Sequence, residues 1–146
     1  MGTLWTTYSR GMPRATPEGT PLSDADASLQ SMPDASPAKW HMAHTSWFFE
    51  TFVLRDFVDG YAPFDEEFAF LFNSYYEAEG ARHDRCHRGM ITRPSLDEVR
   101  EYRAHVDAAI ARNFHALPDE ALTLVELGIH HEQQHQELFQ TDTLPL

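Results

Sequence analysis

Residues 118–140 read PDEALTLVELGIHHEQQHQELFQ, and this stretch decides the fold of the chain. Pro118 and the two acids after it open a helix, because proline suits the first turn and the helix dipole favours negative charge there. One stripe of this helix repeats at intervals of three and four residues, like the seam that a bundle helix turns toward its partners. Its members are Ala121, Leu124, Gly128, His131, His135 and Leu138.

Other segments carry helical signals as well. A cap followed by a first-turn proline begins a helix over 36–59, and Gly60 ends it. The capping box Ser-Leu-Asp-Glu begins another helix over 95–115, and a short helix is expected over 65–72. A further short helix can start at Ser23, because Ser23 and Asp26 resemble a capping box. No segment alternates with a period of two, so the sequence predicts an all-α fold, a four-helix bundle.

Composition narrows the class of protein. The chain has 146 residues, of which 42 % are hydrophobic, enough for one domain with a real core. Residues 23–142 are the expected bundle, 1–22 a proline-rich, poorly ordered coil, and 143–146 a tail. A net charge of −12 argues against nucleic acid as a partner. No apolar run approaches the roughly 18 residues of a membrane span, no secretory start is visible, and Cys86 is the single cysteine, so a cytoplasmic protein is expected.

The last helix also carries the most specific chemistry. His131 and His135 lie four residues apart, so both imidazoles project from one face and can bind the same metal ion. His44 falls on the inward stripe of the helix over 36–59 and supplies a third nitrogen. We therefore predict a three-histidine site with positions left open for water, oxygen or substrate. His41 and His130 point off these stripes and are expected to support the site or lie on the surface.

Two other interpretations of these histidines exist. Inward histidines are often core residues with satisfied hydrogen bonds, and in that case the chain is a structural or interaction module. His131 to His135 also matches the zinc-protease pattern H-E-x-x-H. We reject the protease because Leu138 and Thr141 occupy the positions where its extended pattern has glycine and histidine, and only a short segment follows.

Several neighbours are candidate pocket residues. Gln134 and Asn73 are placed at the rim, although a surface or capping role explains them equally well. Glu137 lies about 200° around the helix from His135 by the 3.6-residue period, so it is expected to make a hydrogen bond or ion pair outside the metal's own ligands. Tyr75 is a candidate for the pocket wall, and Gly128 is expected to leave open space beside the histidines.

Arginines concentrate in a short part of the chain. Arginine recognises carboxylates bidentately, so an anion-binding loop is one interpretation. The other, which we favour, is a loop held to the acidic bundle by surface pairs. Cys86 lies in this loop without a clear reactive role. The arginines are Arg82, Arg85, Arg88, Arg93, Arg100 and Arg103.

Four motifs in this order resemble one known family. They are SMPDASPAKWHMAHTSWFFE over 31–50, FNSYYE over 72–77, the Arg-Gly and Arg-Pro pairs at 88–94, and HEQQHQEL over 131–138. Together they resemble the iron-binding N-terminal domain of the sulfoxide synthases of ergothioneine biosynthesis, over about three quarters of the chain.

The resemblance implies a DinB-like four-helix bundle and a function. It implies that His44, His131 and His135 hold a mononuclear non-heme iron(II). The spacing alone leaves zinc or nickel open as alternatives. The family uses oxygen to join a cysteine-type thiol to the imidazole of trimethylhistidine (hercynine), giving a sulfoxide. The catalytic tyrosine of that family lies in a second domain, similar to the sulfatase-modifying factor fold, which we expect to be absent here. We therefore expect an oxidoreductase domain that is inactive alone, and an exposed apolar patch that favours self-association.

One further alternative stays open. A stand-alone DinB-like protein can use a divalent metal for hydrolase or thiol-transferase chemistry, with a metal-bound water or thiolate as the nucleophile.

Overall fold

A computed structural model describes residues 22–74 and 76–143. All regular structure in these ranges is helical, which confirms the all-α prediction. One long helical run consists of α3 (Ala38–Phe49), the π-helical turn η1 (Glu50–Leu54) and α4 (Arg55–Phe57). The other long helices are α6 (Leu96–Asn113) and α7 (Asp119–Thr143). The short elements are α2 (Asp24–Ser28), α5 (Phe68–Leu71), and the 3-10 turns η2 (Glu77–Glu79), η3 (Arg85–Met90) and η4 (Phe114–Ala116).

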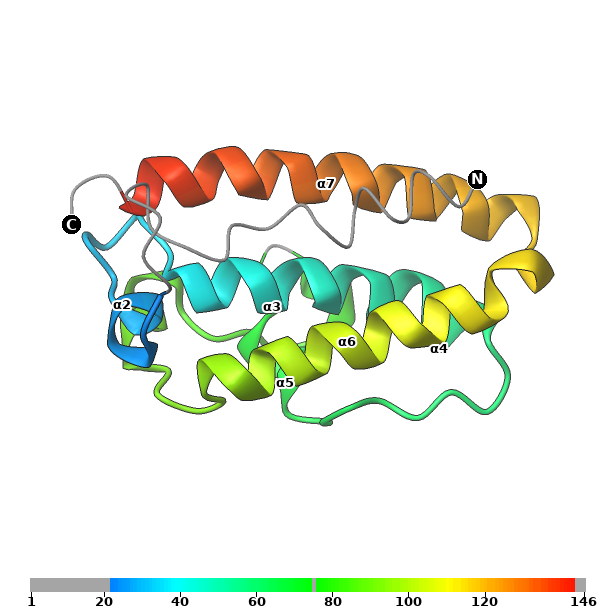
Figure 1. Ribbon diagram of the computed structural model, residues 1–146, viewed down its shortest axis with the longest axis horizontal. Helices are drawn as coiled ribbons and strands as arrows, with labels where there is room; N and C mark the ends of the chain where they lie inside the picture. The colour runs from blue at the N-terminus through cyan, green and yellow to red at the C-terminus, as the bar shows by residue number, and fades with distance from the viewer. Residues whose placement is uncertain (1–21, 75, 144–146) are drawn as a thin grey trace.

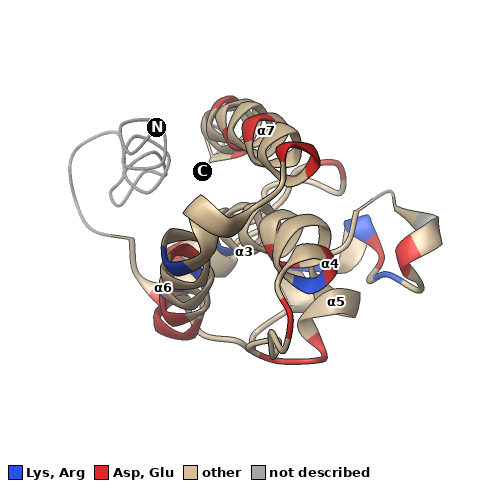
Figure 2. Ribbon diagram, turned by 90° about the vertical axis from the view of Figure 1, so that its right-hand side faces the viewer, with Lys and Arg blue, Asp and Glu red and all other residues tan. Residues whose placement is uncertain are grey.

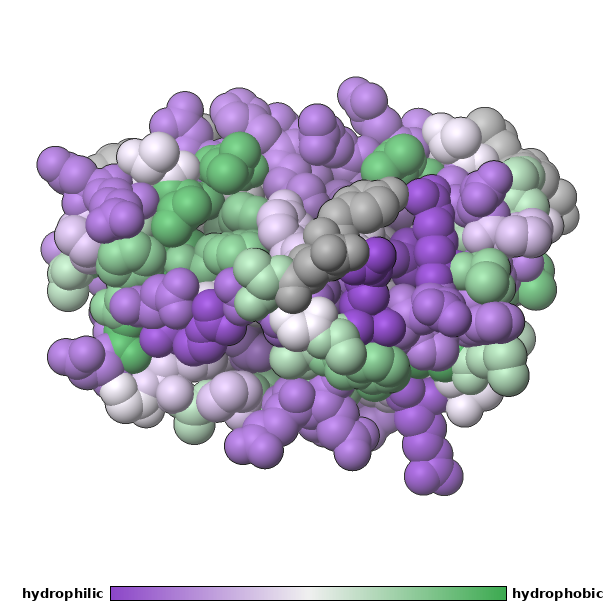
Figure 3. Space-filling view, turned by 180° about the vertical axis from the view of Figure 1, so that it is seen from behind, coloured by the Kyte–Doolittle hydropathy of each residue, from purple (hydrophilic) through white to green (hydrophobic). Residues whose placement is uncertain are grey.

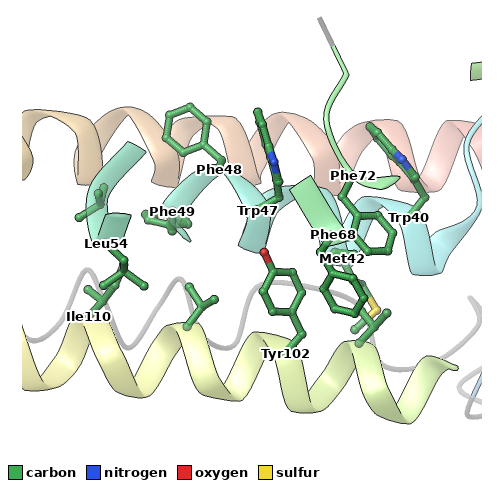
Figure 4. Close-up of a cluster of buried hydrophobic side chains, with 14 of the residues drawn as sticks. Trp40, Met42, Trp47, Phe48, Phe49, Leu54, Phe68, Phe72, Tyr102 and Ile110 are labelled. Atoms are coloured by element: carbon green, nitrogen blue, oxygen red, sulfur yellow. The ribbon is translucent and has the colours of Figure 1, made fainter. Parts of the chain in front are cut away.

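Helix α3 is the centre of the molecule. It lies between α7 and α6, as Figures 1 and 2 show, and every one of its residues is buried. A helix covered on all sides has no polar face, which explains its run of aromatic and small residues. Figure 4 shows Trp47 and Phe48 on the side of α3 that faces α7, while Tyr102 rises from α6 on the other side. Packing against α6 and α7 on both sides holds the side chains of α3 in place.

Local capping explains where two helices begin. Ser23 and Asp26 form a capping box at the start of α2, and Ser95 and Glu98 form another at the start of α6. In each box the serine oxygen accepts from a backbone N–H and the acid reaches back to the serine N–H. Both were visible in the sequence. Gly60, with φ +73°, lies in the turn after α4, where a residue without Cβ meets no steric penalty.

The start of α3 differs from the prediction. Pro37 rather than Ser36 is the residue that caps the helix, and no side chain caps it. The Ser36 backbone N–H instead donates to Asp142 Oδ2 at 2.9 Å, and its hydroxyl accepts from Arg88 at 2.9 Å. Ser36 therefore ties the segment before α3 to the end of α7 and to η3.

The π-helical turn η1 has a polar anchor that the sequence did not reveal. Glu50 is 7 % exposed, and its carboxylate accepts hydrogen bonds from the hydroxyls of Tyr61 and Tyr102. A buried carboxylate needs such partners because burial without them is costly. This contact joins α3, α6 and the loop after α4.

Other boundaries follow the prediction approximately. The short helix expected over 65–72 is α5, and the expected loop that carries Cys86 contains the 3-10 turn η3. Most of the coil expected over 1–22 lies outside the described residues, which begin at Leu22. Tyr75 also lies outside them, as do residues 144–146 of the expected tail.

The surface of the described part is acidic and mixed. Both α6 and α7 carry several acidic residues (Figure 2). Figure 3 shows the face of the molecule that is turned away from the viewer in Figure 1, where apolar residues lie beside hydrophilic ones. Across the described residues, no helix has the length and apolar character that crossing a membrane requires. Exposed large apolar side chains include Phe70, Met90, Leu127 and Leu138.

Candidate metal centre

Three imidazoles meet between α3 and α7. One nitrogen from each of His44, His131 and His135 can be chosen so that all three atoms lie within 4.8 Å of one another. The Nε2 atoms of His44 and His131 are 3.2 Å apart. The ring centroids of the three pairs are 4.5, 4.8 and 4.9 Å apart. The three histidines predicted from helical spacing therefore lie close enough to bind a single metal ion.

Close packing of α7 on α3 brings the rings together. A Cβ added at Gly128 would lie 2.5 Å from Phe49 Cζ and 3.1 Å from a carbon of Phe48. The expectation that Gly128 leaves open space is therefore wrong. Its missing side chain lets the two helices approach, one turn before His131.

Aromatic neighbours and one carbonyl orient His44. Its ring is stacked on Trp40, with centroids 4.5 Å apart and planes 11° apart, and on Trp47 at 5.5 Å and 13°. His44 Nδ1 lies 2.6 Å from the carbonyl oxygen of Phe72. A carbonyl only accepts, so Nδ1 carries the proton and donates it. The Nε2 lone pair of His44 then faces His131.

A fourth histidine lies directly behind the cluster. His41 Nδ1 is 2.9 Å from His135 Nδ1, and His41 Nε2 is 2.8 Å from Asp142 Oδ2. His41 is 2 % exposed. It contacts one candidate ligand, so it supports the site, whereas His130 is exposed on the outer face of α7.

Burial keeps the three imidazoles neutral. It lowers the pKa of His131 to about 4 and that of His135 to about 2, and the latter is lowered further by the nearby His131, His41 and Arg88. Burial, and then the other two rings, hold the pKa of His44 well below its usual range. Neutral rings have the free lone pairs that a metal requires.

The geometry fits a metal ion. Two metal–nitrogen bonds of about 2.1 Å that end on nitrogens 3.2 Å apart enclose an angle of about 100°. That angle lies between the octahedral and tetrahedral values. Neutral imidazoles packed with nitrogens this close are costly unless a proton or a metal ion lies between the facing lone pairs.

A cavity of about 290 Å³ adjoins the histidines. Its wall contains the three candidate ligand histidines together with polar, aromatic and cationic side chains, and such a mixture is typical of a small-molecule site. Residues that line it besides the histidines include Trp40, Ser74, Tyr76, Arg88, Gln134 and Leu138.

The structure places the other predicted pocket residues in different environments. Gln134 lines the cavity. Asn73 is fully buried, and its amide closes a turn by bonding both backbone groups of Tyr76, so it is a structural residue. Glu137 is exposed, and the structure gives its carboxylate neither of the expected bonds. Tyr75 lies outside the described residues.

Glu132 excludes the protease arrangement. It is 1 % exposed, and its Oε1 accepts from Arg103 at 2.8 Å on the side of α7 that faces α6. Arg103 also donates to Thr45. A carboxylate held in this pair cannot act as the general base beside a metal-bound water, as the H-E-x-x-H pattern requires.

The inward stripe of α7 therefore differs from the predicted seam. Leu138 is 45 % exposed and Leu124 is half-buried. The buried stripe consists of Ala121, Val125, Gly128, Ile129, Glu132, His135 and Phe139.

Arginines hold the loop differently from the surface pairs expected. The Arg88 guanidinium lies 3.5 Å from the ring centroid of Trp40 and donates to the hydroxyls of Ser36 and Ser74. Arg85 donates to the backbone oxygen of Asp34. Arg88 is 4 % exposed, so its charge is part of the cavity wall rather than the surface.

Two contributors to this site, Arg88 and Asp142, were not predicted from the sequence. Arg88 was one of several clustered arginines, and only its alignment with Trp40 in space separates it from the rest. His41 was visible one turn before His44, but its partner Asp142 lies about a hundred residues away.

A scan against protein-family models and a search of curated proteins found no match for this chain.

Proposed function

We propose that this chain supplies a mononuclear non-heme iron(II) site for oxygen-dependent carbon–sulfur bond formation, as in the sulfoxide synthases that it resembles. The observation that carries the proposal is the convergence of His44, His131 and His135 beside a cavity. Bound iron would supply activation of molecular oxygen. A DinB-like four-helix arrangement belongs to the same proposal, supported by the three long helical segments described above.

The proposed reaction balances as one thiol, one hercynine and one O₂ giving one sulfoxide and one water. An S–H bond and an imidazole C–H bond break, while a C–S bond and an S–O bond form. The two organic substrates lose four electrons, and O₂ accepts them. One oxygen atom ends on sulfur and the other leaves as water.

The cavity suits substrates of this kind. Arg88 and Arg85 bring positive charge to its wall, and both hercynine and a cysteine-type thiol carry a carboxylate that arginine binds well. Gln134 at the rim can donate or accept a hydrogen bond. These residues bind and orient substrate beside the three imidazoles.

One observation favours a second candidate function. None of the three residues in the cluster is a carboxylate, and an all-imidazole set also suits zinc. The nearest acid on the helix, Glu132, is held by Arg103. A zinc-loaded form would perform hydrolysis or thiol transfer without oxygen.

Oxygen consumption by matched metal-loaded samples tests the choice. The chain is purified anaerobically, loaded with Fe²⁺ or Zn²⁺, and mixed with hercynine, cysteine and O₂. An electrode measures oxygen uptake, and mass spectrometry measures sulfoxide formation.

Because the catalytic tyrosine of the family lies in a second domain, we expect little or no turnover by this chain alone, and any oxygen uptake or sulfoxide only with Fe²⁺ and with both organic substrates present. In parallel, hercynine is expected to change the visible spectrum of the Co²⁺-loaded chain, which reports binding even at low turnover. An Fe²⁺-loaded chain that neither binds hercynine nor consumes oxygen contradicts the proposal. Oxygen-independent turnover of a thiol or ester by the Zn²⁺ form establishes the second candidate.

A further inference from the structure

The far end of the histidine cluster contains a chain of three side chains. Asp142 Oδ2 lies 2.8 Å from His41 Nε2, and His41 Nδ1 lies 2.9 Å from His135 Nδ1. His41 is 2 % exposed, and the Asp142 side chain is 13 % exposed. The three groups form an unbroken line from the edge of the protein to a candidate metal ligand.

Asp142 is itself held in place. Its Oδ2 also accepts the backbone N–H of Ser36 at 2.9 Å, and its own carbonyl accepts from the Ser31 hydroxyl at 2.8 Å. Burial alone would raise the pKa of Asp142, but the bonds from His41 and Ser36 outweigh it and lower the pKa. The carboxylate is therefore an acceptor with a fixed position.

The direction of the protons follows from this acceptor. A carboxylate accepts, so His41 Nε2 carries the proton between them. With that proton on Nε2, a neutral His41 has a lone pair on Nδ1. The facing Nδ1 of His135 must then be the donor, which leaves the Nε2 lone pair of His135 free.

We propose that Asp142 and His41 are positioning residues that fix the proton of His135 on Nδ1 and present its Nε2 lone pair to the metal. The proposal rests on the proposed metal function. A carboxylate or carbonyl that orients a ligating histidine directly is common. Here a second histidine stands between the carboxylate and the ligand, so one acid sets two imidazole tautomers in series.

The His44 contact shows the same principle on the other side of the site. Its Nδ1 donates to the carbonyl of Phe72, which leaves Nε2 for the metal. Two of the three ligands thus have an acceptor behind them that selects Nε2. His131 has no such partner, because its Nδ1 is buried without a hydrogen bond.

Two measurements test the proposal: the histidine tautomers, determined by NMR, and the affinity for metal. Long-range ¹H–¹⁵N spectra of the full chain identify which nitrogen of each histidine is protonated, with and without Zn²⁺. Zn²⁺ titration gives the dissociation constant. The variants are Asp142→Ala, His41→Phe and Ser31→Ala. Ser31→Ala loosens the same junction between the loop and α7 but leaves the three-residue chain intact, so it is the matched control.

The metal-free wild type is expected to show Nδ1–H on His135 and Nε2–H on His41. Asp142→Ala and His41→Phe should lose the single tautomer of His135 and raise the Zn²⁺ dissociation constant about tenfold, the lower end of the effect of removing a supporting hydrogen bond. Ser31→Ala should stay within threefold of wild type.

Several results would overturn the inference. Nε2–H on His135 in the wild type would mean that His41 carries the proton between the two Nδ1 atoms. Variants that bind Zn²⁺ as tightly as Ser31→Ala would show that the chain does not position the ligand. A wild type that binds no metal refutes the proposed function instead, and the tautomers of the metal-free protein then decide the positioning claim alone.

Discussion

Replacing Gly128 with alanine is predicted to destabilise the protein by forcing α7 away from α3. The new Cβ would lie 2.5 and 2.6 Å from two ring carbons of Phe49, which is fully buried. Carbon atoms in contact normally stay about 3.5–4.0 Å apart, so the ring or the helix must move by about 1 Å. Overpacking of this kind costs about 1–3 kcal/mol, and the higher helix propensity of alanine offsets about 1 kcal/mol of that cost. We expect a net loss of up to about 2 kcal/mol.

Urea denaturation of Gly128→Ala and wild type measures this loss, and Thr123→Ala on the exposed face of α7 is the control. Thr123→Ala should leave the free energy of unfolding nearly unchanged. Adding Phe49→Leu to Gly128→Ala should recover part of the loss, because the smaller side chain makes room. A rise in stability of about 1 kcal/mol in Gly128→Ala would refute the reasoning, since it would show helix propensity acting without a steric clash.

Three further effects are expected. Glu132→Ala should lose about 3–5 kcal/mol in urea denaturation by leaving Arg103 without its buried partner, and equal stability to wild type would contradict the pairing. Burial raises the pKa of Asp107 to about 6, so the stability due to its protonated form is lost as pH rises from about 3.8 through 6. Asp107→Asn should therefore gain about 1–2 kcal/mol at pH 7, and an unchanged slope of stability against pH would count against this. The lowered pKa values of His131 and His135 act in the opposite direction, so the metal-free protein should lose stability as pH falls from about 6.5 to 4, measured by thermal unfolding.

Features that depend on neighbouring residues were predictable from the sequence. The capping boxes at Ser23 and Ser95 need only residues within one turn, and both were found. The histidine triad was also accessible, because an inward i, i+4 pair and one more inward histidine limit the geometry strongly. The sequence could place His44 on a stripe that faces inward, and this was sufficient to bring it near the pair.

Features that depend on the position of a partner helix were not predictable. The α7 sequence has two adjacent stripes with spacings of three and four, and the buried one contains Glu132, whose partner Arg103 lies on α6. The role of Gly128 required knowing that Phe49 lies against it. The link from His41 to Asp142 joins the start of α3 to the end of α7, and no local pattern encodes it.

The most direct test of the metal site is the Fe²⁺ or Co²⁺ affinity of single-histidine variants. Anaerobically purified wild type is titrated beside His44→Ala, His131→Ala and His135→Ala. His130→Ala is the matched control, because it removes an exposed imidazole adjacent to His131 on the same helix.

We expect one metal ion per chain in the wild type and in His130→Ala, and a loss of affinity of at least about 100-fold in each of the other three variants. Circular dichroism should show that all variants remain helical. A wild type that binds no metal, or a loss in His130→Ala as large as in His131→Ala, would contradict the three-histidine site.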